Sequence, residues 1–323
     1  MFKKAAEGST ARLMQLCTGY FLFYVATGLL VKLFTASSPE ASPRMDDIAF
    51  LAYNTLGANL TCLIPAVALG WWRMESIRPL RLGRWNLPSE LLYIIPSGVC
   101  TAVVIPTTTL MYTLPISVMV AMVIMRASVI VIGRLVDEVQ IRQGILDKRV
   151  YAEENIAVLF AIGAASIELL GSNGGHFDFL RNRAAVVILA SYIAAYAIRI
   201  YIMNYYKNTR PKGAPLDNKA FFATEQIAAS ATMTLIAGLV LLSPRWFPSW
   251  SEVPQVAAFI SAVRLPASGW GWAVCSGVVF GVVAFFSVFI FMFKGRTATF
   301  TGLVNRLTSL VAGTTATLIG WLF

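Results

Sequence analysis

The stretch AFLAYNTLGANLT at residues 49–61 is followed, 171 positions later and without gaps, by AFFATEQIAASAT at residues 220–232. Five positions are identical; Phe50, for example, falls on Phe221. Self-similarity at a fixed distance indicates an internal repeat. Both copies lie in long apolar segments, so the second membrane-buried helix of the chain corresponds to the seventh.

Two further matches keep the same order along the chain, at offsets of 172 and 180. The later match places Arg126 over Arg306, and its larger offset follows from a long connection at 243–269. Three matches in one order favour a duplication more strongly than any single one. The additional pairs are YFLFY (20–24) with YIAAY (192–196) and VIMRAS (123–128) with LVNRLT (303–308).

The composition is that of a membrane protein. Of 323 residues, 57% are hydrophobic and 13% are charged, and the mean hydropathy is +0.69. Crossing the roughly 30 Å hydrocarbon core takes about 20 apolar helical residues, and the segments are too long and too little alternating for barrel strands. An all-α polytopic fold is therefore expected. Its nine predicted transmembrane helices are 13–34, 47–71, 91–112, 114–133, 151–171, 184–205, 220–242, 270–293 and 297–323.

The repeat divides the chain into a first half-repeat at 1–175, with helices one to five, and a second at 176–323, with helices six to nine. Five helices per unit is an odd number, so the two halves face opposite ways across the bilayer, as in many secondary transporters. The counterpart of helix five would begin near residue 331. The tenth helix of this inverted 5+5 repeat is thus either absent or outside this sequence.

The net charge of +10 is interpreted as an orientation signal and not as a sign of nucleic-acid binding. Loops on the side of the N-terminus carry 17 lysines and arginines, and those on the other side carry 5. The positive-inside rule then places the N-terminus in the cytoplasm. An inner or plasma membrane is favoured, and an organellar membrane stays open. Residues 136–150 are expected to form a charged cytoplasmic connection, and 243–269 an interfacial amphipathic segment.

Glu225 is an ionisable residue inside the seventh predicted span, and such residues are functional candidates by default. One interpretation is an ion pair with Arg199, Arg126 or Arg306 that locks helices together. The other is that Glu225 contacts a cationic substrate group or takes up a coupling proton. The sequence leaves both open.

Arg126 and Arg306 lie about ten residues inside their helices, where a guanidinium that cannot lose its charge needs an anion, a group of carbonyls or water. Paired arginines at equivalent positions would hold a phosphate or a carboxylate. Asn54, the repeat partner of Glu225, together with Asn305 and Tyr196, would supply hydrogen bonds. The substrate-binding residues predicted from sequence are therefore Glu225, Arg126, Arg306, Asn305, Asn54 and Tyr196.

Two five-helix inverted halves resemble the drug/metabolite transporter superfamily, which includes EamA-like permeases and nucleotide-sugar transporters. MRASVIVIGRLV at 125–136 is similar to the fourth-helix pattern of that family. GLVNR at 302–306 resembles the Gly-Ala-Leu-Asn-Lys motif of GDP-mannose transporters, which implies nucleotide contacts for Asn305 and Arg306. The family's Phe-Tyr-Asn-Asn motif on the seventh helix is replaced here by FFATEQ.

These features predict a secondary transporter of a small polar or amphipathic metabolite with an anionic group, working by alternating access and with a proton as candidate coupling ion. The alternative is a non-transporting integral subunit or scaffold with a transporter-like fold. An enzyme is not expected, because no HExxH, GxSxG or paired-carboxylate spacing occurs. No cofactor or metal is expected either. Membrane lipids and the small-molecule substrate are the expected partners, and a homodimer or larger membrane complex stays open.

Overall fold

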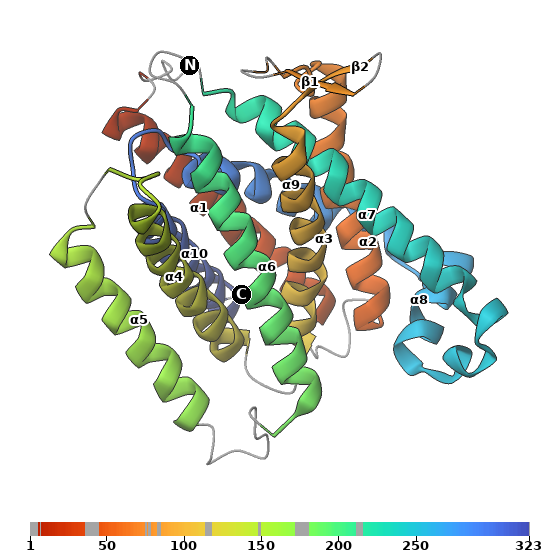
Figure 1. The fold of residues 1–323 in the computed structure, drawn as a ribbon. Coiled ribbons are helices and arrows are strands. Elements are labelled where there is room, and N and C mark those ends of the chain that lie inside the picture. Colours follow the sequence, from red (N-terminus) through yellow and green to blue (C-terminus); the bar gives the residue numbers. More distant parts are fainter. Residues whose placement is uncertain are drawn as a thin grey trace.

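The computed structural model describes residues 6, 8–35, 45–74, 76, 79–82, 85–113, 118–147, 150–171, 181–210 and 216–322. Within these residues the chain forms a bundle of ten α-helices with one small β-hairpin (Figure 1). The helices are α1 (Thr10–Thr35), α2 (Asp47–Ala68), α3 (Leu91–Thr113), α4 (Val118–Arg142), α5 (Ala152–Gly171), α6 (Arg183–Asn208), α7 (Asn218–Trp246), α8 (Pro254–Arg264), α9 (Trp270–Phe291) and α10 (Ala298–Leu322), with a 3-10 turn, η2, at Pro248–Glu252.

The helices give the chain the character of an integral membrane protein. In the part of the chain that the structure describes, six helices are long and apolar enough to cross a bilayer: α1, α2, α3, α6, α7 and α9. Large apolar side chains such as Leu159 and Phe160 are exposed on the bundle surface, as expected where helices face lipid. Helices α4, α5 and α10 occupy the other three predicted spans, and the count of nine spans stays a prediction.

The sequence analysis missed a β-hairpin between α2 and α3. Strands β1 (Pro79–Leu82) and β2 (Trp85–Pro88) are antiparallel, with Leu80 paired to Leu87. This segment carries the β-prone Leu and Trp residues but no apolar run long enough for a span. A proline lies at the outer end of each strand, where a missing ladder donor is tolerated. The hairpin lies at the same end of the bundle as the first turn of α1 (Figure 1).

The predicted connection at 136–150 was placed wrongly. Helix α4 continues to Arg142, well beyond the expected end at residue 133, and Asp137 is fully buried. The reason is tertiary, since the Asp137 carboxylate is held by the first residues of α10. At 243–269, by contrast, the predicted amphipathic piece does contain a helix, α8, which begins at Pro254 and packs beside α2.

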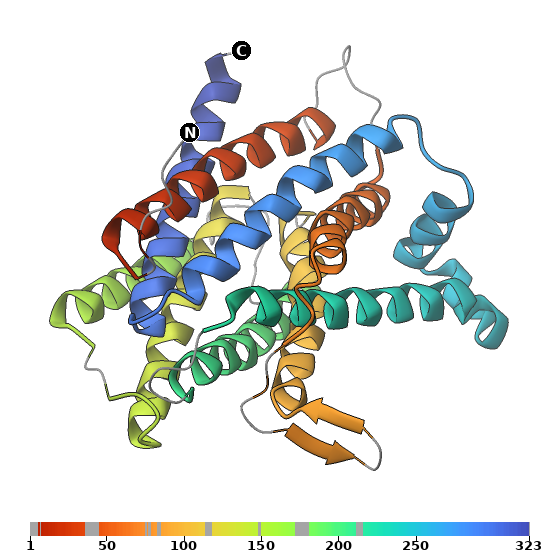
Figure 2. The same ribbon diagram turned by 90° about the horizontal axis from the view of Figure 1, so that it is seen from above.

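Helices from the two ends of the chain interleave. Helix α1 packs against α9 and α10, and α6 packs against α3 and α4 (Figures 1 and 2). Helix α2 lies along α9, while α3 lies along α7. Helices α4 and α10 also contact each other, and α5 covers α4 at the edge of the bundle.

Small residues allow close crossings of α2 with α9 and of α3 with α7. A Cβ added to Gly277 of α9 would lie 2.0 Å from the backbone oxygen of Asn54 in α2, and one on Gly57 would lie 2.0 Å from that of Val274. At the α3–α7 crossing, a Cβ on Gly98 would lie 2.6 Å from the backbone oxygen of Glu225. Without Cβ atoms at these positions, the backbones approach as closely as membrane helices do at small-residue contacts.

Candidate functional site

Two arginine–tyrosine pairs meet in the interior of the bundle. Arg126 of α4 donates a hydrogen bond from Nη2 to the hydroxyl of Tyr24 in α1, and its guanidinium lies 5.5 Å from the centre of that ring. Arg306 of α10 lies 4.9 Å from the ring centre of Tyr196 in α6 and interacts with it electrostatically. The two guanidiniums are close enough to interact electrostatically. We call these four residues the arginine–tyrosine centre.

Two more tyrosines and an amide complete the surroundings of this centre. The Tyr20 hydroxyl donates to Oδ1 of Asn305 at 3.4 Å, and Asn305 donates from Nδ2 to Ser287 of α9 at 3.0 Å. The ring of Tyr20 lies 5.5 Å from that of Tyr24, and the ring of Tyr192 lies 4.7 Å from that of Tyr196. Tyr20 and Tyr192 interact electrostatically with both arginines.

Arg306 is the most deeply buried cation of the centre. Its side chain is 1% exposed, and the ring of Phe291 lies 5.4 Å from its guanidinium in addition to Tyr196. Across the described ranges, neither Nε nor Nη2 has a hydrogen-bond partner. No salt bridge to Arg306 is found among the described residues. Buried N–H groups without an acceptor are costly, at about 1–3 kcal/mol each, so this cation has unused binding capacity.

Glu225, the carboxylate that stood out in the sequence, is fully buried and forms an ion pair. Arg199 of α6 donates from Nε to Oε1 and from Nη2 to Oε2, both at 2.9 Å. Ser97 of α3 adds a third hydrogen bond to Oε1 at 2.5 Å. Of the two interpretations, the structure therefore gives the carboxylate a partner that ties α3, α6 and α7 together.

This ion pair adjoins the arginine–tyrosine centre. Tyr196 and Arg199 lie one turn apart on α6 and interact electrostatically. Of the six predicted site residues, the structure thus brings Arg126, Arg306, Tyr196 and Asn305 together, with Glu225 beside them. The sixth, Asn54, hydrogen-bonds Ser276 of α9 at 3.2 Å, within the close α2–α9 crossing, where it serves helix packing.

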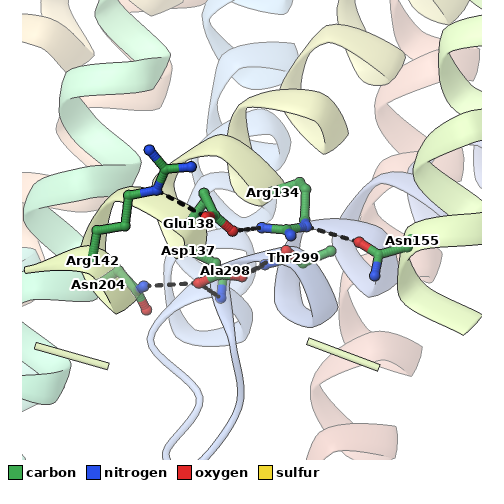
Figure 3. A network of polar contacts seen from close by, with 8 residues as sticks. All are labelled: Arg134, Asp137, Glu138, Arg142, Asn155, Asn204, Ala298 and Thr299. Carbon is green, nitrogen blue, oxygen red and sulfur yellow. Dashed lines mark hydrogen bonds and ion pairs between the residues drawn. The ribbon is translucent and has the colours of Figure 1, made fainter. Parts of the chain in front are cut away.

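A second polar network lies where α4 ends and α10 begins (Figure 3). Both oxygens of the Asp137 carboxylate accept hydrogen bonds from α10: Oδ1 from the Ala298 amide at 2.9 Å, and Oδ2 from the amide and the hydroxyl of Thr299 at 2.6 Å each. Asn204 of α6 donates to Oδ1 at 3.1 Å. A carboxylate at this position accepts hydrogen bonds from the free N–H groups at the start of the helix, and its negative charge is attracted by the positive end of the helix dipole.

More exposed charges surround that network. Glu138 bridges Arg134 and Arg142 at 3.1 and 3.0 Å on the surface of α4, and Arg134 also donates to Asn155 of α5 at 2.8 Å (Figure 3). The sequence analysis missed Asp137 because it assigned residues 136–150 to a charged cytoplasmic connection. It also missed Ser97, Tyr20 and Tyr192. For the two tyrosines a signal existed, because Tyr20 aligns with Tyr192 in the repeat.

The remaining observations concern metal ligands and similarity to known proteins. Within the described ranges no group of three or more His, Cys, Asp or Glu residues could hold a metal ion. His176, the single histidine of the sequence, lies outside the described residues. Comparisons with protein-family models, with functionally described proteins and with solved structures give no match for this chain. The resemblance to the drug/metabolite transporters stays an expectation from sequence.

Proposed function

We propose that this chain is a secondary transporter that moves a small polar or amphipathic metabolite with an anionic group, by alternating access between two inverted halves. One observation carries the proposal. Tyr24–Arg126 and Tyr196–Arg306 are the same pair of side chains at positions equivalent in the repeat, and they meet across the two halves. In transporters built from inverted repeats, the substrate site lies at this kind of junction near the bilayer midplane.

The packing pattern supports the proposed repeat. Under the alignment, α1, α2, α3 and α4 correspond to α6, α7, α9 and α10. The contact of α1 with α9 then has its counterpart in that of α6 with α3, and the contact of α1 with α10 in that of α6 with α4. Likewise α2–α9 matches α3–α7. Asn59 and Ser230, which are equivalent in the alignment, even contact each other, with Ser230 donating a hydrogen bond at 3.4 Å.

The charge of the centre supports an anionic substrate. Two guanidiniums close to each other repel, and burial removes the water that would screen them. An anion between the two guanidiniums would relieve their repulsion and would accept hydrogen bonds from the Nε and Nη2 groups of Arg306. Glu225 is occupied by Arg199, so a role for this carboxylate in proton coupling requires that ion pair to open during the cycle.

The Asp137 network suggests how one end of the site is closed. Asp137 belongs to the first half, and the N-terminus of α10 and Asn204 belong to the second. With the N-terminus in the cytoplasm, this contact lies at the cytoplasmic end of the helices. Alternating access would then separate α4 from α10 here, and the described structure corresponds to a state closed on that side.

The second candidate, a non-transporting membrane subunit, is favoured by the burial of the charged side chains inside the bundle. Arg126, Arg199, Glu225 and Arg306 are all 0–7% exposed. A scaffold would keep these contacts permanently, whereas a transporter must open them.

Reconstitution in liposomes separates the two functions. Purified protein should accumulate labelled organic anions in a counterflow assay, and Arg306→Gln should abolish that uptake while the protein remains monodisperse. A substrate library that includes carboxylates, phosphate esters, amines and neutral solutes gives the carrier every opportunity to act. If no solute in that library moves faster than through protein-free liposomes, the transporter proposal is wrong and the subunit interpretation is preferred.

A further inference from the structure

Arg306 presents two unused donors along one edge of its guanidinium. Nε and Nη2 are both buried and have no hydrogen-bond partner in the described part of the chain. In a guanidinium, the N–H of Nε and one N–H of Nη2 are parallel and lie in the plane of the group. They form a two-donor fork that matches two oxygens on one atom.

The same protein shows what such a fork binds. Arg199 uses the same two atoms, Nε and Nη2, to hold Oε1 and Oε2 of Glu225 at 2.9 Å each. Arg199 lies one turn from Tyr196, which in turn contacts Arg306. Both arginines therefore interact with Tyr196, one with its fork filled by a carboxylate and one whose fork is filled by no group among the described residues.

The surroundings of the free fork limit what it can take. The centres of the Tyr196 and Phe291 rings lie 4.9 and 5.4 Å from the guanidinium, so aromatic rings are among the groups nearest to the fork. Arg126 adds a second positive charge nearby. The hydroxyl of Tyr192 is buried and has no hydrogen-bond partner within the residues that the structure describes, and Tyr192 interacts electrostatically with both arginines. A planar anion with an apolar or aromatic body fits these neighbours.

We propose that the Nε–Nη2 edge of Arg306 binds the carboxylate of the substrate side-on, so that the substrate class is organic carboxylates and not phosphate esters. This inference rests on the proposed function and narrows it. A carboxylate uses two coplanar oxygens and one negative charge. A phosphoryl group is tetrahedral and carries a third terminal oxygen outside the plane of the fork. That oxygen would need a further hydrogen-bond donor, whereas the rings of Tyr196 and Phe291 flank the guanidinium.

The test measures binding without transport. The full chain in nanodiscs of zwitterionic lipid is titrated calorimetrically with acetate, benzoate and 3-phenylpropionate, and then with 2-phenylethyl phosphate and 3-phenylpropan-1-ol. We expect saturable binding of at least one carboxylate, tighter than that of the phosphate and the alcohol. Arg306→Gln and Arg306→Lys should each weaken it by about tenfold or more, because lysine keeps the charge but lacks the fork.

Two further variants test whether the loss of carboxylate binding is specific to this site. Arg264→Lys changes an exposed arginine of α8 and should bind as the unaltered protein does. Tyr192→Phe removes only the unpartnered hydroxyl and should weaken carboxylate binding by about two- to tenfold without disturbing the fold. Size-exclusion profiles of all variants must match that of the unaltered protein.

The inference is overturned if no carboxylate binds, if the phosphate ester binds more tightly, or if Arg306→Lys retains the original affinity. Its failure is distinguishable from that of the transporter proposal. Carboxylate binding that depends on Arg306, without any flux in liposomes, supports the site and refutes the carrier. Arg306-dependent flux of a phosphate ester or a neutral solute supports the carrier and refutes the carboxylate class.

Discussion

The ion pair between Arg199 and Glu225 offers the sharpest test of how the interior is held together. Replacing Glu225 by glutamine keeps the shape of the side chain and removes its charge. Arg199, which is 7% exposed, then remains as a buried cation with a neutral partner.

The magnitude follows from the geometry. Two parallel hydrogen bonds of 2.9 Å place the charge centres about 4 Å apart, where unit charges attract by about 4 kcal/mol at an effective dielectric constant of 20. Breaking a buried pair by removing one partner is typically destabilising by about 3–5 kcal/mol. We therefore expect Glu225→Gln to lower the free energy of unfolding by about 3 kcal/mol or more.

A double-mutant cycle isolates the interaction. Arg199→Met with Glu225→Met leaves neither charge behind, and such apolar replacements of buried pairs are often neutral. The double variant should be more stable than either single variant, which requires a coupling free energy larger than the cost of a single substitution, about 3 kcal/mol or more. Glu252→Gln, at an exposed glutamate of η2, is the control and should not change stability measurably.

The assay is equilibrium unfolding in mixed micelles with increasing SDS fraction, followed by circular dichroism and tryptophan fluorescence. Additive effects of the two single substitutions would refute the reasoning, because they would mean that the two side chains do not interact. A Glu225→Gln protein of unchanged stability would have the same consequence and would return Glu225 to the role of a free titrating group.

Three further predictions concern helix contacts and topology. Gly277→Ala should destabilise the protein by about 1–3 kcal/mol, since its Cβ would meet the α2 backbone. Gly271→Ala on the same helix, where no atom of the described residues lies within 4 Å of the added Cβ, should be tolerated in the same unfolding assay. Asp137→Asn should lower the free energy of unfolding by about 1–3 kcal/mol, because it weakens the charge-assisted hydrogen bonds to α10. The neighbouring substitution Glu138→Gln is the control and should leave the free energy of unfolding unchanged. Equal effects of the two substitutions would contradict a specific role for Asp137. Nine spans with a cytoplasmic N-terminus require alkaline phosphatase fused after Phe323 to be active and a green fluorescent protein fused there to be dark. The opposite result would exclude nine spans with a cytoplasmic N-terminus.

The sequence alone was sufficient for the membrane class, because apolar segments of span length report directly on the solvent that surrounds them. It also marked Arg126, Arg306 and Glu225, since a charge within such a segment stands out against its neighbours. The alignment behind the proposed repeat also paired tyrosines that surround the arginines, as Tyr20 aligns with Tyr192, although periodicity could not separate these rings from ordinary packing.

Only the tertiary structure decided which charges meet. Glu225 had three candidate arginines in the sequence, and the choice of Arg199 depends on how α6 and α7 lie against each other. Asp137 looked like a loop residue because its partners, the first amides of α10, are about 160 residues away in the chain. Contacts of this kind depend on the relative positions of whole helices, and a local sequence pattern contains no information about them.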